Sequence, residues 1–243
     1  MRLEGKTAVV TGGGTGIGLG IAVALAAEGC RVAIAGRRAE LLQEVVKSHQ
    51  GPTPLVGHPV DVSDRQSVER LFQWAAQELG PIDILVNSAG TNIVHRALAD
   101  TTFEEWSMLL DVNLTGTFYC LQAVLPQMRS RGDGLVINVS SIAGKRALRL
   151  GGVGYCASKF AVTALGTFAS LEEGKNGIRV TNIYPGEVDT PILERRPVPL
   201  TAEHRSRILQ PEDVGAAAVM IACLPPRAHV AEIVIKPTTQ EYA

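Results

Sequence analysis

Seven short runs rich in valine and isoleucine alternate with longer stretches of helical spacing, and this alternation restricts the fold more than any other feature of the chain. The runs lie at 7–11, 31–35, 54–60, 82–87, 134–140, 178–184 and 231–235, and most are apolar throughout, as in parallel strands covered on both faces. The helical stretches lie at 16–29, 38–48, 64–79, 102–129, 155–174 and 211–223. The pattern predicts an α/β fold with a doubly wound parallel sheet.

Length, charge and cysteine content narrow the class of protein. With 243 residues, 46% of them apolar, we expect one domain over residues 1–243. A net charge of −1 argues against a nucleic-acid partner, because phosphates favour a basic surface. We expect neither export nor a membrane span, since the N-terminus lacks a signal segment and no run of about 18 apolar residues is present. The four cysteines have no ligand spacing, which predicts reduced thiols, a cytoplasmic location and no metal site.

A glycine-rich turn, Thr11-Gly12-Gly13-Gly14-Thr15-Gly16-Ile17-Gly18, follows the first apolar run. It opens a helical stretch, so the amides of a helix N-terminus could bind a pyrophosphate. This predicts nucleotide binding by Gly12, Thr15, Gly16, Ile17 and Gly18. The Gly-x-x-x-Gly-x-Gly spacing differs from the common Gly-x-Gly-x-x-Gly fingerprint, and a tight structural turn would contain the same glycines.

The second run ends in Arg37 and Arg38, where a protein that prefers NAD usually has an acidic residue. Two guanidinium groups there could pair with a 2′-phosphate, which favours NADP; the other interpretation is a solvated pair on a loop. Polar or small residues also end the third and fourth runs, namely Asp61, Val62, Asn87, Ser88, Ala89 and Gly90. Ligands bind at such strand ends in open sheets, although Asp61 could equally serve as a turn or helix-cap residue.

Tyr155 and Lys159 stand one helical turn apart, so an ammonium group lies beside a phenol. A phenol with a pKa of about 10 needs about 4 kcal/mol of stabilisation of its ionised form to exchange protons near pH 7. The lysine supplies part of this, and the positive ring of a bound cofactor would add more. Hydride transfer leaves negative charge on oxygen, for which Ser141 and Tyr155 are suitable donors.

For two of the candidate site residues, Ser141 and Asn113, the sequence also allows a purely structural role. Ser140 and Ser141 are adjacent, and either could instead cap a strand end. Asn113 lies within the stretch 102–129, where asparagine is unfavourable for a helix, which indicates a functional role or a bend.

Together these residues resemble the short-chain dehydrogenase/reductase family. The shared motifs are Thr11-Gly12-x3-Gly16-Ile17-Gly18, Asn87-x-Ala89-Gly90, Asn113, Ser141, Tyr155-x3-Lys159 and Pro185-Gly186-x-Val188-x-Thr190, in the family's order along nearly the whole chain. The resemblance implies strand order 3-2-1-4-5-6-7 with three helices on each face. It also implies a homotetramer or homodimer formed through the helices at 102–129 and 155–174, and a small-molecule substrate.

The resemblance further implies a role for each matching residue. Tyr155 becomes the general acid/base, Lys159 the ligand of the nicotinamide ribose, and Ser141, followed by Ile142-Ala143-Gly144 as in the family, the donor to the substrate oxygen. Asn113 would anchor a water near Lys159, while Asn87, Ala89 and Gly90 would line the nucleotide. Pro185, Gly186, Val188 and Thr190 would cover the nicotinamide. The implied activity is interconversion of a carbonyl and an alcohol with NADP(H), or with NAD(H).

The substrate is less constrained. The irregular stretch 185–211 is predicted to be a mobile loop over the site, and Glu187 lies in it. Arg146 or Arg149 could clamp a carboxylate or be exposed loop cations, and His95 is not expected to be catalytic because the Tyr/Lys pair supplies proton transfer.

The C-terminal part lacks the Asp-Gly-Gly ending of many family members and is similar to the branch of NADP-dependent 3-hydroxy acid and serine dehydrogenases. Two alternatives remain: a 3-oxoacyl-[acyl-carrier-protein] reductase-like enzyme, and a non-catalytic NADP(H)-sensing or scaffold protein.

Overall fold

The predicted sheet is confirmed by the computed structural model, which describes residues 1–241. Seven strands form one sheet in the order β3-β2-β1-β4-β5-β6-β7, and every neighbouring pair is parallel. The strands are β1 (Thr7–Thr11), β2 (Arg31–Gly36), β3 (Leu55–Pro59), β4 (Ile84–Asn87), β5 (Gly134–Val139), β6 (Ile178–Pro185) and β7 (Glu232–Ile235). The order reverses between β1 and β4, and a ligand crevice is expected at such a point.

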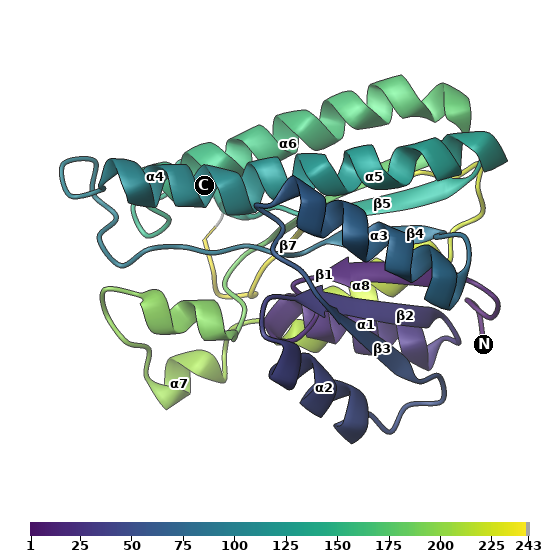
Figure 1. Cartoon of the computed structure of the whole chain (residues 1–243). Coiled ribbons are helices and arrows are strands. Elements are labelled where there is room, and N and C mark those ends of the chain that lie inside the picture. The colour runs from purple at the N-terminus through teal and green to yellow at the C-terminus, as the bar shows by residue number, and fades with distance from the viewer. Residues whose placement is uncertain (242–243) are drawn as a thin grey trace.

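The helices form one layer on each face of the sheet (Figure 1). One layer consists of α1 (Gly16–Ala27), α2 (Ala39–Ser48) and α8 (Pro211–Ala222). The opposite layer consists of α3 (Arg65–Leu79), α5 (Gly116–Arg131) and α6 (Val153–Glu173). The strands serve both layers because successive side chains point to opposite faces: Ala8 and Val10 pack against the first layer, and Val9 against the second. This explains why the strands read as uniformly apolar.

The stretch expected to be one helix over 102–129 contains a π-helical segment. α4 (Phe103–Leu110) leads into Asp111–Thr115, which has π-helical geometry, and then into α5. Thr102 caps the start of α4, since its hydroxyl accepts the N–H of Glu105 and the Glu105 carboxylate accepts the N–H of Thr102. Asn113 lies within this π-helical segment, so the residue that is unfavourable for a helix coincides with a local departure from α-helical geometry.

This long helix also corrects the expectation that nothing in the chain is apolar enough to cross a membrane. By length and composition alone, Phe103–Arg131 passes that test, with a mean hydropathy of 1.3 over its best window. In its α5 part, Cys120, Leu121 and Val124 are buried in the hydrophobic core between the sheet and the layer of α3, α5 and α6. Core helices of globular proteins meet the same criterion, so one such helix is weak evidence for a membrane span.

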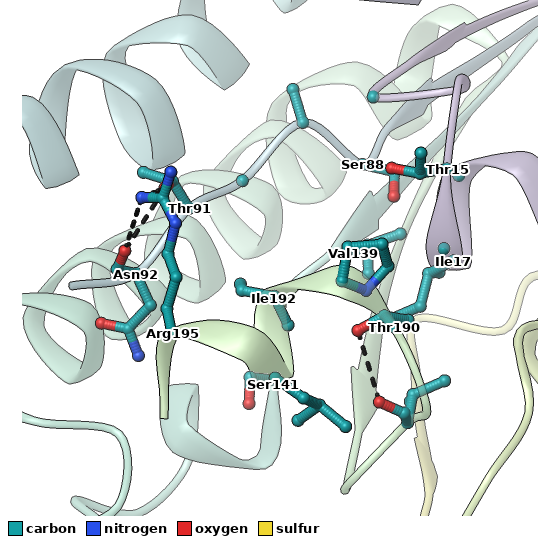
Figure 2. Close-up of a pocket in the computed structure, with 18 of the residues that line it drawn as sticks. Thr15, Ile17, Ser88, Thr91, Asn92, Val139, Ser141, Thr190, Ile192 and Arg195 are labelled. Atoms are coloured by element: carbon teal, nitrogen blue, oxygen red, sulfur yellow. Dashed lines mark hydrogen bonds between the residues drawn. The ribbon is translucent and has the colours of Figure 1, made fainter. Parts of the chain in front are cut away.

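The stretch 185–211, which we call the cover segment, contains two short helical pieces that the sequence did not indicate. They are a 3-10 helix, η4 (Pro191–Arg195), and α7 (Ala202–Arg205). A parallel bridge between Val188 and Leu209 joins the two ends of the segment. Arg195 reaches across to the loop that follows β4, where its Nη1 donates to Thr91 Oγ1 and to the Asn92 carbonyl, both at 2.9 Å (Figure 2). The cover segment is therefore tied to the body of the protein by side-chain hydrogen bonds.

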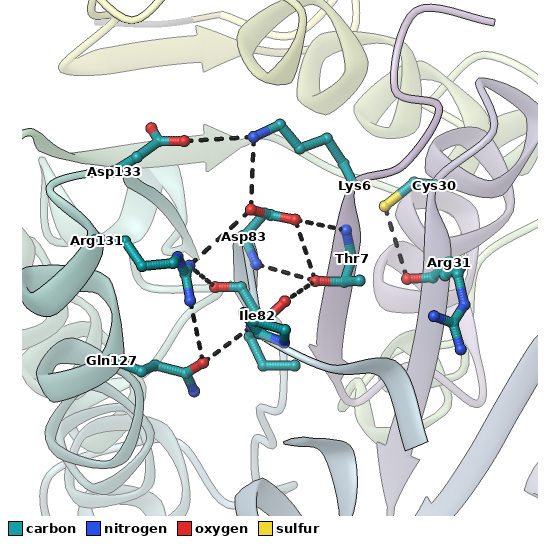
Figure 3. Close-up of polar contacts among 10 residues, drawn as sticks. Lys6, Thr7, Cys30, Arg31, Ile82, Asp83, Gln127, Arg131 and Asp133 are labelled. Carbon is teal, nitrogen blue, oxygen red and sulfur yellow. Dashed lines mark hydrogen bonds and ion pairs between the residues drawn. The ribbon is translucent and has the colours of Figure 1, made fainter. Parts of the chain in front are cut away.

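Charged side chains hold the opposite, amino-terminal edge of the sheet together (Figure 3). Asp83, just before β4, accepts the N–H of Thr7 at 2.9 Å and its hydroxyl at 3.2 Å. The ammonium of Lys6 lies 3.5 Å from Asp83 and 3.3 Å from Asp133. Arg131 Nη2 donates to the Ile82 carbonyl at 2.6 Å. These contacts fix the starts of β1, β4 and β5, and so the register of the strand ends on the far side.

Candidate active site

A cavity of about 800 Å³ lies at the carboxyl ends of the strands, where the turn after β1 meets the turns after β4 and β5. It brings together most of the residues predicted for the site. Those that line it are Gly12, Thr15, Gly16, Ile17, Gly18, Arg37, Arg38, Asp61, Val62, Ala89, Gly90, Ser141, Tyr155, Lys159, Pro185, Gly186, Val188 and Thr190. Asn87 and Asn113 lie outside this lining. The volume falls within the range typical of small-molecule and cofactor sites.

Close backbone packing requires glycine at two positions of the first turn, which also lines the cavity. Gly12 has φ +67°, and a Cβ there would lie 2.8 Å from the backbone nitrogen of Ala89. A Cβ on Gly18 would collide with the carbonyl of Gly12. Thr11 Oγ1 accepts the N–H groups of Ser88 and Ala89, each at 3.3 Å. The turns after β1 and β4 therefore touch backbone to backbone, which only glycine permits at these positions.

The N-terminus of α1 fits an anionic ligand. Thr15 occupies the N-cap position, yet within the described residues its side chain makes no cap hydrogen bond. Ordinarily a threonine there would accept an amide of the first turn. Thr15, Gly16 and Ile17 all line the cavity, so the first amides of α1 remain available to a pyrophosphate.

The far end of the cavity is basic. Arg37 and Arg38 follow β2, and both are exposed and line the cavity. Asp61 serves as the turn residue that the sequence left open, because its Oδ1 accepts the N–H of Ser63 at 3.0 Å and the hydroxyl at 2.6 Å. The Ser63 hydroxyl lowers the pKa of Asp61, and the charge of Arg37 lowers it further. Asp61 also lines the cavity, so the turn role does not remove it from the candidate site.

Asn113 links the loop after β4 to helix α6 through hydrogen bonds of its side-chain amide. It is 1% exposed, its Oδ1 accepts the N–H of Thr91 at 2.8 Å, and its Nδ2 donates to the Thr91 carbonyl at 3.1 Å and to Ser158 Oγ at 2.9 Å. A Cβ on Gly90 would lie 3.5 Å from Asn113 Oδ1 and 3.6 Å from Lys159 Nζ. The amide therefore holds the loop after β4 in place beside Lys159.

Asn87 likewise belongs to the scaffold. Its Nδ2 donates to Asn138 Oδ1 at 3.0 Å, and Asn138 Nδ2 donates to Asn182 Oδ1 at 3.2 Å, which forms a row of amides across β4, β5 and β6. Asn87 Oδ1 is buried without a hydrogen-bond partner among the described residues. The row fixes the relative positions of three strand ends.

Tyr155 and Lys159 lie on the same face of α6, as their spacing predicts. The ammonium lies 5.6 Å from the centroid of the phenol ring. Lys159 is 5% exposed, and its Nζ donates to the Val139 carbonyl at 2.9 Å. Burial lowers the pKa of Lys159 to about 8. The amine is thus held by strand β5 next to the ring.

The ionisation of Tyr155 differs from the expectation based on the lysine. Burial raises the pKa of Tyr155 above its ordinary value, against smaller lowering contributions from the Ser141 hydroxyl and the charge of Arg96. In the protein alone, desolvation therefore outweighs the neighbouring charges, and the phenol is protonated at neutral pH.

Both adjacent serines line the cavity, but their hydroxyls are bonded differently. Ser140 is 3% exposed, and its Oγ donates to the Lys159 carbonyl at 3.1 Å. Ser141 begins a 3-10 helix, η2 (Ile142–Gly144), where its Oγ accepts the N–H of Ala143 at 3.1 Å. Ser141 lies at the cavity (Figure 2), and its hydroxyl proton remains available for a ligand. The capping role and the donor role are compatible, because the first uses the oxygen and the second the proton.

The arginines that line the cavity away from Arg37 and Arg38 are not Arg146 and Arg149, the two considered as a carboxylate clamp from the sequence. Arg146 and Arg149 lie outside the cavity lining, and so does His95. Arg96, Arg195 and Arg196 line it instead. The sequence offered one signal, since Arg195 and Arg196 stand inside the predicted cover segment. Arg96 follows the fourth strand without any motif.

Glu187 lies in the cover segment, as expected, and its carboxylate contacts Arg196 and His204. Its carboxylate lies 3.0 Å from Arg196 Nη2 and 2.7 Å from His204 Nε2. His204 and Arg196 keep the pKa of Glu187 below its ordinary value, although burial opposes them. Within the described part of the chain, no group of three metal-ligating side chains is present, and the four cysteines are free thiols.

A glycine turn under a helix N-terminus, with a serine, a tyrosine and a lysine in the same cleft of a parallel sheet, defines a nucleotide-binding α/β enzyme. The short chain dehydrogenase family matches residues 6–198. An uncharacterized oxidoreductase of Staphylococcus aureus strain USA300 is 37% identical over 239 residues, which cover 97% of this chain and 98% of that protein. One from Staphylococcus saprophyticus is also 37% identical, with 98% and 99% coverage.

Two solved structures of oxidoreductases are also similar to this chain. An alcohol dehydrogenase from the archaeon Thermococcus sibiricus, complexed with 5-hydroxy-NADP, has a TM-score of 0.88 at 28% identity, covering 98% of this chain and 99% of that one. The closed form of a serine dehydrogenase complexed with NADP+ has a TM-score of 0.88 at 30% identity, covering 98% and 97%. The chain belongs to the short-chain dehydrogenase/reductase family and is an oxidoreductase.

Proposed function

We propose that this protein interconverts a carbonyl and an alcohol on a small substrate with NADP(H). The observation that carries the proposal is that Ser141, Tyr155 and Lys159 line one cavity together with the glycine turn after β1. The similar structures described above, which were determined with NADP+ and 5-hydroxy-NADP, support the choice of cofactor.

Different residues along the cavity would bind different parts of the cofactor. The uncapped N-terminus of α1 would hold the pyrophosphate, and Arg37 with Arg38 would pair with the 2′-phosphate. The Lys159 ammonium, of which one proton is used by the Val139 carbonyl, would donate to ribose hydroxyls. When bound, the cofactor supplies a hydride to the carbonyl carbon or accepts one from the alcohol carbon.

Tyr155 would pass the proton. In reduction the carbonyl carbon gains the hydride, and the oxygen takes the phenolic proton, which solvent later replaces. The raised pKa keeps the phenol protonated at neutral pH, as this role requires. Ser141 would donate to the same oxygen while negative charge develops on it, and Lys159 would stabilise the phenolate that remains.

The test is NADPH oxidation against a panel of aldehydes, ketones, 3-oxo acids and 3-oxoacyl thioesters. Tyr155→Phe should lower kcat on any active substrate by at least about 100-fold, the usual contribution of a positioned acid, and leave NADPH binding intact. Tyr119→Phe, a tyrosine on α5 outside the cavity lining, is the matched control. Folded protein that binds NADPH but reduces nothing in the panel would instead favour the sensing or scaffold alternative.

Cofactor choice has its own test. Arg37→Ala should weaken NADPH binding about 10-fold to 100-fold and leave NADH nearly unchanged, because only NADPH has a phosphate for this guanidinium. Arg149→Ala, an exposed arginine outside the cavity lining, is the control. Equal losses for both cofactors would show that Arg37 is not the residue that distinguishes them.

We also propose a homotetramer or homodimer in the cytoplasm, formed through α4, α5 and α6. Large apolar side chains are exposed on these helices, including Phe103 (89%), Phe168 (65%) and Leu171 (79%). Sedimentation of the wild type should give a defined oligomer, and Phe168→Glu should shift it to smaller species. A wild type that sediments as a monomer at micromolar concentration would contradict this.

A further inference from the structure

The substrate end of the cavity contains three arginines from two distant parts of the chain. Arg96 comes from the loop after β4, and Arg195 and Arg196 from the cover segment. All three line the same cavity as Ser141 and Tyr155. Burial lowers the pKa of Arg96, the charge of Arg196 lowers it further, and Tyr155 raises it. The three guanidinium groups therefore border the same cavity as the proposed acid.

The positions of Arg96 and Arg195 are fixed by uncharged acceptors. Arg96 Nε donates to the Ile93 carbonyl at 2.8 Å, its Nη2 to the Arg195 carbonyl at 2.8 Å, and its Nη1 to the Leu150 carbonyl. Arg195 in turn donates to Thr91 and Asn92, as Figure 2 shows. Each guanidinium has five N–H groups, so donors remain after these bonds.

The positive charge at this end exceeds the negative charge that faces it. Glu187 pairs with Arg196, and His204 shares the same carboxylate. Glu194 also lines the cavity and, like Arg195, is exposed, so three arginines face two carboxylates here. Neither Arg96 nor Arg195 forms an ion pair with any carboxylate in residues 1–241. Grouping like charges in a half-buried site costs free energy, and a bound anion would offset that cost.

We propose that Arg96 is a specificity-determining residue that binds a carboxylate of the substrate, so that the enzyme acts on carbonyl or hydroxy compounds that carry this group. Arg195 is a positioning residue, because its carbonyl accepts from Arg96 and its side chain anchors the cover segment. The planar fork of Arg96 suits a carboxylate. This inference rests on the proposed carbonyl and alcohol chemistry and names its substrate class.

The experiment compares acids with their uncharged counterparts on the NADPH-loaded enzyme. Acetoacetate is paired with methyl acetoacetate, and levulinate with methyl levulinate. We expect kcat/KM for each acid to exceed that for its ester by at least about 10-fold, as a charge-assisted hydrogen bond provides. Arg96→Gln should raise KM for the acids about 10-fold to 100-fold and change kcat/KM for the esters less than about 3-fold. Arg96→Lys should restore part of the loss.

Two controls separate a binding role from a structural one. Arg149→Gln, outside the cavity lining, should leave both substrates unaffected. NADPH affinity, measured by fluorescence, should be the same in Arg96→Gln and the wild type. Should Arg96→Gln fail to fold, binding of butyrate and butyramide to the wild-type complex with NADP+ decides the matter, and butyrate should bind at least about 10-fold more tightly.

The outcomes that overturn this inference differ from those that overturn the proposed function. Esters reduced as well as acids, equal losses on both in Arg96→Gln, or equal binding of butyrate and butyramide would each refute the carboxylate site while leaving carbonyl reduction in place. Reduction of no substrate in either series or in the wider panel would refute the proposed function itself.

Discussion

Replacing Lys159 by methionine should stabilise the folded protein at neutral pH while removing its activity. The amine is 5% exposed, and its pKa is lowered from 10.5 to about 8 by burial. At about 1.4 kcal/mol per pKa unit, burying the ammonium costs about 3 kcal/mol below pH 8. Methionine has a similar length and no charge, but it loses the hydrogen bond to the Val139 carbonyl, worth about 1 kcal/mol. We therefore expect Lys159→Met to be about 2 kcal/mol more stable at pH 7.

The pH dependence distinguishes this cause from better packing. Between pH 8 and 10.5 the unfolded wild type still carries a proton on this amine, whereas the folded protein has lost it. The wild type thus gains stability relative to the variant as the pH rises through this window, and its deficit should shrink. At pH 7 both states of the wild type are protonated, so the full deficit is present.

Urea unfolding at pH 7, 8, 9 and 9.5 measures the effect on both proteins. Lys47→Met, an exposed lysine on α2, is the matched control and should change the free energy of unfolding by less than about 0.5 kcal/mol at every pH. A Lys159→Met protein that is less stable than the wild type at pH 7, or a difference that stays constant with pH, would show that the buried charge does not destabilise the fold.

Three further changes test the scaffold. Asp83→Ala should cost about 2 kcal/mol in urea unfolding, because it leaves the Thr7 amide without its acceptor, whereas the Thr7 hydroxyl keeps the Pro81 carbonyl (Figure 3); Asp133→Ala, at a more exposed position, should cost less than half as much. Gly166→Ala should cost at least about 1 kcal/mol, because its Cβ would collide with Asn182 Oδ1; an unchanged midpoint contradicts that packing. Arg129→Ala should cost about 2 kcal/mol above pH 5, by leaving the carboxylate of Glu173, 1% exposed, without its partner. The pKa of Glu173 is lowered by Arg129, so this cost should fall as the pH drops and the carboxylate is protonated.

Local patterns predicted the sheet and much of the site. The Val/Ile runs indicated strands buried on both faces, and the residues at the ends of those runs do meet at one edge of the sheet. The spacing of Tyr155 and Lys159 predicted a shared helix face, which a 5.6 Å separation of ammonium and ring centroid confirms. These features follow from periodicities of the backbone, which operate over a few residues.

Longer-range contacts were not visible in the sequence. Asn113 lies in a π-helical segment, and its amide bonds Thr91, 22 residues away. The clamp suggested for Arg146 or Arg149 rested on their closeness to Ser141 in sequence, yet neither lines the cavity. Arg96 does line it, and its Nη2 binds the carbonyl of Arg195, 99 residues away. Sequence distance is a poor guide to which loops meet above a sheet.

The sequence by itself determined the alternation of strands and helices, the glycine turn, and the tyrosine and lysine on one helical turn, because each depends on local geometry and side-chain chemistry. Three features could be seen only in the folded structure: how the hydroxyls of the two neighbouring serines are bonded, which arginines line the cavity near Tyr155, and how strongly burial acts on Tyr155 and Lys159. Desolvation and the direction of a side chain depend on everything packed around it, and that environment is assembled from segments far apart along the chain.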